Sequence, residues 1–132
     1  MFDMPQIMHM AQSMARHAAA RQGIVAANVA NSDTPGYAAR DLRPFAETYR
    51  TSTASQPTGT MRATRAGHAG LHPDAALIRI EPDPAPATRN PNGNTVSVER
   101  EMMRAVDIRQ SHERALGIYA TARNILRASL GR

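Results

Sequence analysis

Apolar residues recur with helical spacing at both ends of the chain. From residue 6 to residue 31 they follow one another at intervals of three, four or seven positions, with no interior proline. The same spacing returns from residue 97 to residue 130, where Ser97 is a suitable N-cap and Glu99 and Arg127 suit the charges at the two ends of a helix. The pattern predicts two long amphipathic helices over these ranges. The apolar stripe of the second helix comprises Val98, Met102, Ala105, His112, Leu116, Tyr119, Leu126 and Leu130.

The helical period is lost between these two segments. The intervening sequence is rich in Pro, Gly, Thr, Ser and Ala, and such compositions bury too little apolar surface to offset the entropy cost of ordering. Phe45 and Tyr49 are four residues apart and indicate a local helical turn. Residues 77–80 indicate a short strand, which Pro82 would end. We therefore expect the middle of the chain to be irregular, flexible and partly β.

The expected fold class is mostly α, with the two terminal helices packed as a coiled-coil-like pair. The chain of 132 residues is 42% hydrophobic but only 4% aromatic, and much of the hydrophobic fraction is Ala and Met. Alanine buries little surface and methionine packs adaptably, so a lone chain should be marginally stable and should gain burial from neighbouring subunits. The expected organisation is an N-terminal helix and turn over 1–36, a flexible connection over 37–94 and a C-terminal helix over 95–132.

The first predicted helix runs into a specific stop. Thr34-Pro35-Gly36-Tyr37 fits a type II turn, because Pro35 restricts φ at the first central position and Gly36 allows the positive φ required at the second. Asn28 and Asn31 lie three residues apart on one helical face. We expect both carboxamides to reach the turn and hold its backbone. The alternative is that Asn31 caps the helix alone while Asn28 is solvated.

The charge of the chain leaves a second class of function open. The formal net charge is +5 and all 16 basic residues are arginine. A small basic nucleic-acid-associated protein would have such a charge, and the C-terminal helix concentrates arginines. Elsewhere the arginines are spread along the chain without the interleaved aromatic residues of a nucleic-acid surface. This class therefore remains the alternative to a structural protein.

Catalytic and metal chemistry are not indicated. The chain has no cysteine, no lysine for a phosphate loop and no G-x-S-x-G motif. His68 and His72 have a spacing that suits a metal only on a helix, and the glycines and proline around them argue against one. We expect no enzyme activity, no cofactor, no metal and no small-molecule substrate. The sequence also lacks a signal-peptide pattern and a run of apolar residues long enough to span a membrane.

The segment Ala27-Asn28-Val29-Ala30-Asn31-Ser32-Asp33-Thr34-Pro35-Gly36-Tyr37 resembles the signature of the flagellar axial proteins, which are the rod, hook and hook-associated subunits. Their pattern is A-N-x-A-N-x-x-T-P-G-[YF] at the end of the first helix. The segments 38–42 and 93–102 resemble the proximal rod subunits of the basal body. The resemblance covers roughly residues 10–45 and 90–130.

This resemblance implies a structural subunit of the proximal rod. Such subunits are exported unfolded by the flagellar type III apparatus without signal cleavage. They polymerise helically, through their terminal helices, into the periplasmic drive shaft that transmits torque and encloses the export channel. The implied partners are copies of the chain, other rod subunits, and the membrane-ring adaptor and export gate at the rod base. Another proximal rod subunit of the same family is a further alternative.

Two groups of residues are the candidate assembly sites. Arg109 and Arg123 interrupt the apolar stripe of the C-terminal helix, which suits a surface shared with other proteins better than an isolated two-helix coil. The predicted signature residues are Asn28, Asn31, Thr34, Pro35, Gly36 and Tyr37. The predicted interface residues on the C-terminal helix are Met102, Val106, Arg109, Leu116, Tyr119, Arg123, Leu126 and Leu130.

Overall fold

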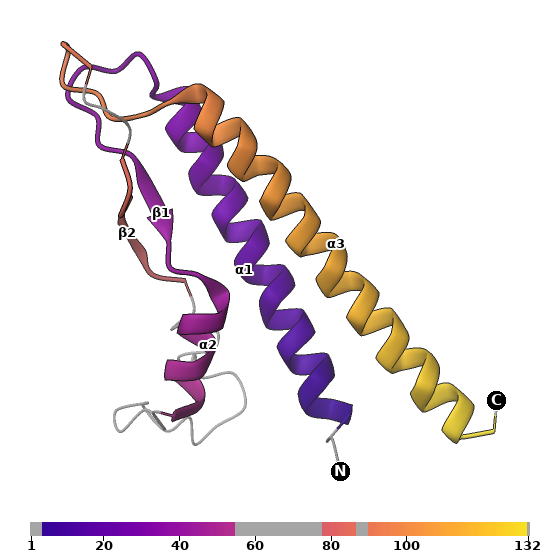
Figure 1. Ribbon diagram of the computed structural model, residues 1–132. Coiled ribbons are helices and arrows are strands. Elements are labelled where there is room, and N and C mark those ends of the chain that lie inside the picture. Colours follow the sequence, from indigo (N-terminus) through magenta and orange to yellow (C-terminus); the bar gives the residue numbers. More distant parts are fainter. Residues whose placement is uncertain (1–3, 55–77, 87–89, 132) are drawn as a thin grey trace, which may run out of the picture.

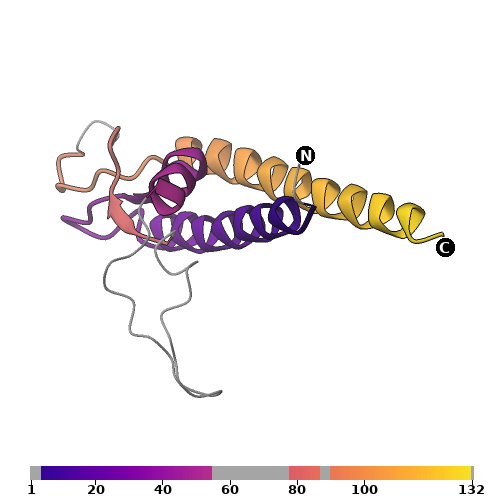
Figure 2. The same cartoon turned by 90° about the horizontal axis from the view of Figure 1, so that it is seen from below.

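Two long antiparallel helices dominate the computed structural model, which describes residues 4–54, 78–86 and 90–131. The elements in chain order are α1 (Met4–Ala30), β1 (Arg40–Leu42), α2 (Phe45–Ala54), β2 (Ile80–Pro82) and α3 (Val98–Ser129). The end of α1 and the start of α3 meet at one end of the molecule, and the helices run side by side from there (Figure 1). Figure 2 shows the same pairing from below, with α3 extending beyond α1 at the far end. The predicted fold class is confirmed.

The ends of α3 follow the capping rules that its sequence indicates. The Ser97 hydroxyl accepts a hydrogen bond from the N–H of Arg100 at 3.4 Å and donates to the Glu99 carboxylate at 2.8 Å. Arg127 lies in the last turn. The chain then leaves the helix through Gly131, whose φ of 73° lies in the left-handed region. The predicted N-cap is confirmed.

Small side chains form the seam between α1 and α3. The buried apolar positions on each helix are seven residues apart, so they return to the same face after two turns. They are Ala11, Ala18 and Val25 on α1, and Ile108, Ala115 and Ala122 on α3. We call these six residues the alanine seam. Alanine lets two helices approach closely but buries little apolar surface.

The predicted apolar stripe of α3 does not coincide with this seam. Met102, Leu116 and Leu130 belong to the predicted stripe, yet they are 62%, 51% and 79% exposed. The packed face includes Ala115, one position from Leu116, and the larger side chains are left outside. The stripe was predicted from the spacing of apolar residues, whereas the close approach of the helices selects alanines.

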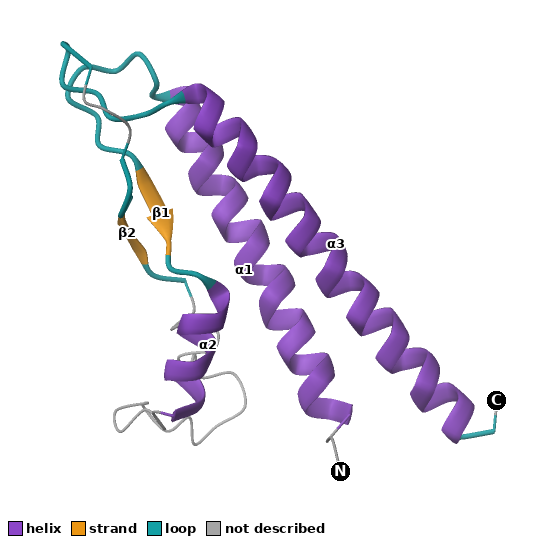
Figure 3. Cartoon of the chain, in the orientation of Figure 1, coloured by secondary structure: helices purple, strands orange, loops and turns teal. Residues whose placement is uncertain are grey.

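The middle of the chain carries a short two-stranded sheet and a helix. β1 and β2 pair antiparallel, with Asp41 opposite Glu81 and Arg40 opposite Pro82 (Figure 3). The strand was predicted over residues 77–80. Leu77 lies outside the described residues, and β2 begins at Ile80 and includes Pro82. A proline is tolerated at the end of such a strand because it needs no ladder donor there. The helical turn predicted around Phe45 is the start of α2.

Candidate assembly site

The chain leaves α1 through the predicted turn. The N–H of Tyr37 donates to the carbonyl of Thr34 at 3.3 Å, which closes the four-residue turn. Gly36 has a φ of 71°, the value that the second central position of a type II turn requires. The turn chemistry inferred from Pro35 and Gly36 therefore matches the structure.

Asn28 is buried completely and uses its carboxamide on both sides. Its Nδ2 donates to the carbonyl of Arg40 at 2.8 Å and to Oε2 of Glu101 at 3.1 Å. Its Oδ1 accepts from the N–H of Arg40 at 3.2 Å and from the Tyr37 hydroxyl at 3.4 Å. Asn28 thus holds the chain beyond the turn, and the alternative of a solvated Asn28 is wrong.

Asn31 plays a more local part than we expected. Its Nδ2 donates to the carbonyl of Ala27 at 2.8 Å, and its Oδ1 accepts from the Thr34 hydroxyl at 3.3 Å. It caps the end of its own helix and contacts a side chain of the turn. The sequence had instead predicted that Asn31 would bind the backbone of the turn. The reason is its position: α1 ends at Ala30, so the Asn31 side chain lies beside the last turn of the helix, where the Ala27 carbonyl also accepts from the N–H of Asn31 at 3.2 Å.

The residue that holds the turn backbone is Asn94, which the sequence analysis did not single out. It is completely buried, and its Nδ2 lies 2.8–2.9 Å from the carbonyl oxygens of Asn31, Ser32 and Thr34. Its Oδ1 accepts from the N–H of Val96 at 2.7 Å. The sequence placed it only within residues 93–102, the segment that resembles the proximal rod subunits. The carbonyls that it binds are more than 55 residues away, so no local pattern predicts the contact.

Backbone hydrogen bonds join the two segments that cross here, which we call the corner (residues 31–39 and 90–96). Gly36 donates its N–H to the carbonyl of Asn92 at 3.0 Å, and Thr95 donates to the carbonyl of Tyr37 at 3.1 Å. Gly93 has a φ of 82°, and a Cβ at this position would lie 3.4 Å from Cα of Gly36. Two glycines therefore allow two backbones to cross closely.

A set of buried and half-buried polar and charged side chains lies beside the corner, and we call it the polar cluster. Arg21 binds both carboxylate oxygens of Asp41, at 2.7 and 2.6 Å. Arg104 binds both carboxylate oxygens of Asp83, at 2.8 and 2.7 Å, and also Glu101 at 2.8 Å. Bidentate pairs of this kind hold geometry as well as charge. The polar cluster consists of Arg21, Asn28, Asp41, Asp83, Glu101 and Arg104, and it joins α1, β1, α3 and the residue after β2.

The charges in the polar cluster stabilise one another. Burial alone favours the neutral form of the Asp41 carboxyl group. Hydrogen bonds from Arg21 and from the N–H of Leu42 outweigh burial, so the pKa of Asp41 lies below its usual value. Among the described residues, no buried side-chain nitrogen or oxygen lacks a hydrogen-bond partner. The polar cluster is therefore a satisfied network.

His17 attaches the start of α2 to the middle of α1. Its Nε2 lies 2.9 Å from the carbonyl of Arg43, so the neutral ring carries its proton on this nitrogen. The ring meets Phe45 edge to face, with 5.7 Å between centroids. Burial lowers the pKa of His17 more than its hydrogen bond to Arg43 raises it. His17 therefore fixes the start of α2 against the middle of α1.

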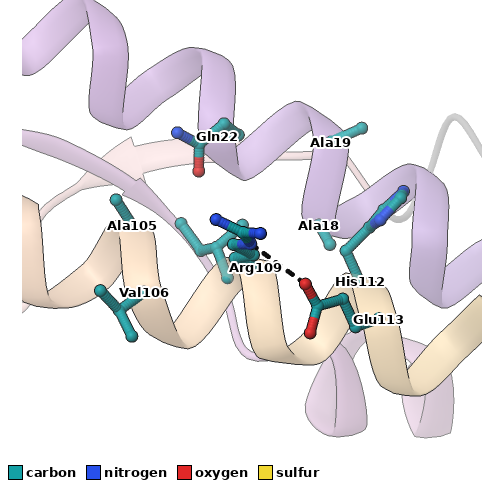
Figure 4. A pocket seen from close by; sticks show the side chains of 9 residues that line it. Ala18, Ala19, Gln22, Ala105, Val106, Arg109, His112 and Glu113 are labelled. Atoms are coloured by element: carbon teal, nitrogen blue, oxygen red, sulfur yellow. Dashed lines mark hydrogen bonds and ion pairs between the residues drawn. The ribbon is translucent and has the colours of Figure 1, made fainter.

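The predicted interface residues of α3 lie mostly on its surface. We call these eight residues the outer face. All are exposed except Leu126, which is half-buried. Next to the outer face, a groove of about 580 Å³ runs between α1 and α3 (Figure 4). Val106 and Arg109 line it from α3 and Ala18 and Gln22 from α1, and Arg109 pairs with Glu113 at 3.0 Å.

The other kinds of site receive no support from the described part of the chain. It contains no group of three or more His, Cys, Asp or Glu side chains that could hold a metal ion. His68 and His72 lie outside the described residues. Several arginines face acids within the chain, among them Arg21, Arg43 and Arg104. None of the described helices is long and apolar enough to cross a membrane.

Comparison with known proteins relates α1 and the turn that follows it to a family. Residues 8–37, which include most of α1 and the turn, match the family model described as flagella basal body rod protein. A flagellar basal body rod protein FlgB of Agrobacterium fabrum is 28% identical over 110 residues, covering 82% of this chain and 80% of the relative. The FlgB of Proteus mirabilis is 34% identical over 94 residues, 66% of each chain. The FlgB of Yersinia enterocolitica is 32% identical over 96 residues, 67% of each chain. These matches do not favour the nucleic-acid alternative, and they show that the chain belongs to the flagellar basal body rod protein family.

Proposed function

We propose that the chain is a structural subunit of the flagellar basal body rod and that it joins other rod subunits through the outer face of α3. Its family and the names of its relatives support a structural and non-enzymatic function. Because all three relatives are named FlgB, we assign the chain to the proximal part of the rod in preference to another position.

The observation that carries the contact surface is the exposure of large apolar side chains on α3. Met102, Val106 and Leu116 are 62%, 58% and 51% exposed, whereas the alanine seam buries small ones. A helix that turns its larger apolar side chains outward gains little from its own chain and can gain much from a neighbour. Arg109 and Arg123 lie among them and can pair with acids of another subunit.

The rest of the assembly follows from the same family assignment. We infer that α1 and α3 form the inner part of a helical polymer, the rod that crosses the periplasm, transmits torque and encloses the export channel. Copies of the chain and other rod subunits are its partners along the rod, and the membrane-ring adaptor and export gate are its partners at the base. We further infer export by the flagellar apparatus without a cleavable signal peptide.

The test replaces two exposed apolar residues of the outer face by acids, in the double variant Val106→Glu/Leu116→Glu. Both side chains are exposed, so the purified variant should keep its helical circular dichroism. In a strain without its own copy of the chain, swimming and the yield of basal bodies with rods should fall by more than about tenfold, because acids in a buried contact remain unpaired.

The matched control is Gln110→Glu/Thr121→Glu. It adds the same charge to exposed positions of α3 outside the outer face, and it should leave swimming and rod yield unchanged. Normal swimming by the Val106→Glu/Leu116→Glu strain would refute the contact surface. Equal loss in both strains would show that α3 tolerates no added acid and would refute the special role of the outer face.

A further inference from the structure

The alanine seam by itself specifies the register of α1 on α3 poorly. Four of its six residues are alanine and its positions repeat every seven residues on both helices. A slide by one heptad, about 10 Å along the axis, would place alanines opposite alanines again. Such a slide changes the buried apolar surface little, so packing alone discriminates weakly between registers.

One pair interrupts this repetition. Asn28 lies three residues after Val25, and Glu101 lies seven residues before Ile108, so both continue the seam toward the corner. They are 0% and 1% exposed and bond to each other at 3.1 Å. A buried polar pair in an otherwise apolar helix contact is a known means of specifying register.

A slid register would leave this pair unsatisfied in either direction. Glu101 would then face position 21 or position 35 of the chain, because α1 advances by seven residues. Position 35 is a proline outside the helix. Position 21 is an arginine that Asp41 already binds through two hydrogen bonds, so Glu101 could take it only by leaving Asp41 unpaired.

The rest of the polar cluster adds to this selection. Asn28 bonds the backbone of Arg40 on both sides, which ties α1 to β1. Arg104 binds Glu101 and reaches Asp83 after β2, which ties α3 to the other strand. Because β1 and β2 are paired with each other, a slide of α3 on α1 would break one of these two connections. We propose that Asn28 and Glu101 are the positioning residues that set the register of α1 on α3. The alanine seam contributes packing contact but does not determine the register.

Cysteine cross-linking of the purified full chain tests the proposal, because the chain has no cysteine of its own. Ala18→Cys/Ile108→Cys reports the native register, since these residues pack together in the core. Ala11→Cys/Ile108→Cys and Val25→Cys/Ala115→Cys report slides in the two directions. Each cysteine pair is introduced into three backgrounds and oxidised mildly. The backgrounds are the otherwise unsubstituted chain, Asn28→Leu/Glu101→Leu and Glu101→Gln. A control on exposed positions, Glu113→Leu/Asn124→Leu, makes the same changes of residue type.

In the unsubstituted chain, the native pair should form its disulfide at least about tenfold more than either slid pair, which corresponds to about 1.4 kcal/mol. In Asn28→Leu/Glu101→Leu that preference should fall to within about twofold while the helical signal persists, since two apolar residues fit the seam in any register. Glu101→Gln retains an acceptor for Asn28 and should retain most of the preference. The exposed control should retain all of it.

Three results would overturn the proposal. One is a native preference that survives in Asn28→Leu/Glu101→Leu, and another is no preference in the unsubstituted chain. The third is loss of the helical signal in Asn28→Leu/Glu101→Leu, because that would make the pair a requirement for folding and not for register. The measurement needs no assembly, so its outcome is independent of whether the outer face joins rod subunits.

Discussion

The two ends of the helix pair differ in what their buried side chains contact. At the corner end, Asn28, Asn94 and Glu101 are almost fully buried, and hydrogen bonds satisfy each of them within the chain. At the far end, the seam consists of small residues such as Ala11 and Ala122, and larger apolar side chains of α3 are exposed. The corner end is therefore specified by directional bonds inside one chain, whereas the seam toward the far end consists of small apolar side chains. Exposed apolar side chains lie along the whole of α3, from Met102 near the corner to Leu130 at the far end.

This difference has an energetic reason. A buried polar group without its partner costs about 1–3 kcal/mol, so a satisfied network strongly prefers one geometry. Burying an alanine contributes much less than burying a leucine, and it prefers no geometry in particular. Such a chain can fix the geometry of its corner by its own hydrogen bonds. It still depends on neighbouring subunits to bury the rest of its apolar surface.

The largest effect should come from removing Asn94. In Asn94→Ala, three backbone carbonyls of the corner lose their common donor, so we expect a loss of roughly 2–4 kcal/mol in the free energy of unfolding. Urea unfolding followed by circular dichroism measures it. Asn124→Ala, an exposed asparagine on α3, is the control and should change the free energy by less than about 0.5 kcal/mol. Equal urea midpoints for the two variants would contradict the prediction that Asn94 stabilises the chain through the corner.

A smaller effect should come from the two glycines of the corner. Both have positive φ, so Gly36→Ala and Gly93→Ala should each lower the free energy of unfolding by about 1–2 kcal/mol. The loss should be greater at Gly93, because its Cβ would also meet Gly36 at 3.4 Å.

Gly23→Ala is the matched control for this series. Gly23 lies inside α1, and a Cβ there meets nothing within 4 Å. Alanine favours helix over glycine, so this variant should stabilise the chain by about 0.5–1 kcal/mol. The same unfolding measurement serves all three variants. Destabilisation by Gly23→Ala equal to that of the corner variants would show that the corner has no special backbone requirement.

The smallest effect should be a pH dependence from His17, which lies between the two ends. Its pKa is lowered in the folded chain, so near pH 6 the unfolded chain binds a proton that the folded chain does not. The free energy of unfolding should therefore decrease as the pH falls below about 6.5 toward the folded pKa, by about 1 kcal/mol or less.

His17→Gln should remove the decrease in the free energy of unfolding that His17 causes between pH 7.5 and pH 5.5. Urea unfolding at each pH measures it. The matched variant is His9→Gln, whose side chain is exposed toward the far end of α1. If His9→Gln flattened the profile and His17→Gln did not, the burial of His17 against α2 would not be the cause.

Local patterns were enough to predict the elements of the corner but not its contacts. Ser97 was predicted as a cap and Gly36 as a residue of positive φ, because each role depends on neighbours within a few positions. Asn28 was recognised as a residue that binds backbone, but its target was taken to be the adjacent turn. Its partners are the backbone of Arg40 and the carboxylate of Glu101, and the latter lies 73 residues away. The periodicity of a sequence cannot reveal a contact between residues so far apart.

The same limit applies to α3. Periodicity predicted an amphipathic helix, and the interface residues on it remain a prediction that the proposed variants test. Which side of the helix meets α1 depends on how closely the two axes approach, and alanine permits a closer approach than leucine. The packed face therefore passes through Ala115, one position from the predicted Leu116.

By itself, the sequence determined the two long helices, the cap of the second, the turn after the first and the resemblance to flagellar axial proteins. These features depend on local backbone preferences and on short motifs. Only the tertiary structure decided that Asn94 holds the turn and that Arg21, Asp41, Asp83 and Arg104 meet in one polar cluster. It also decided which side of α3 is left outside. Hydrogen bonds and ion pairs between distant segments require positions in space, and a chain acquires these only when it folds.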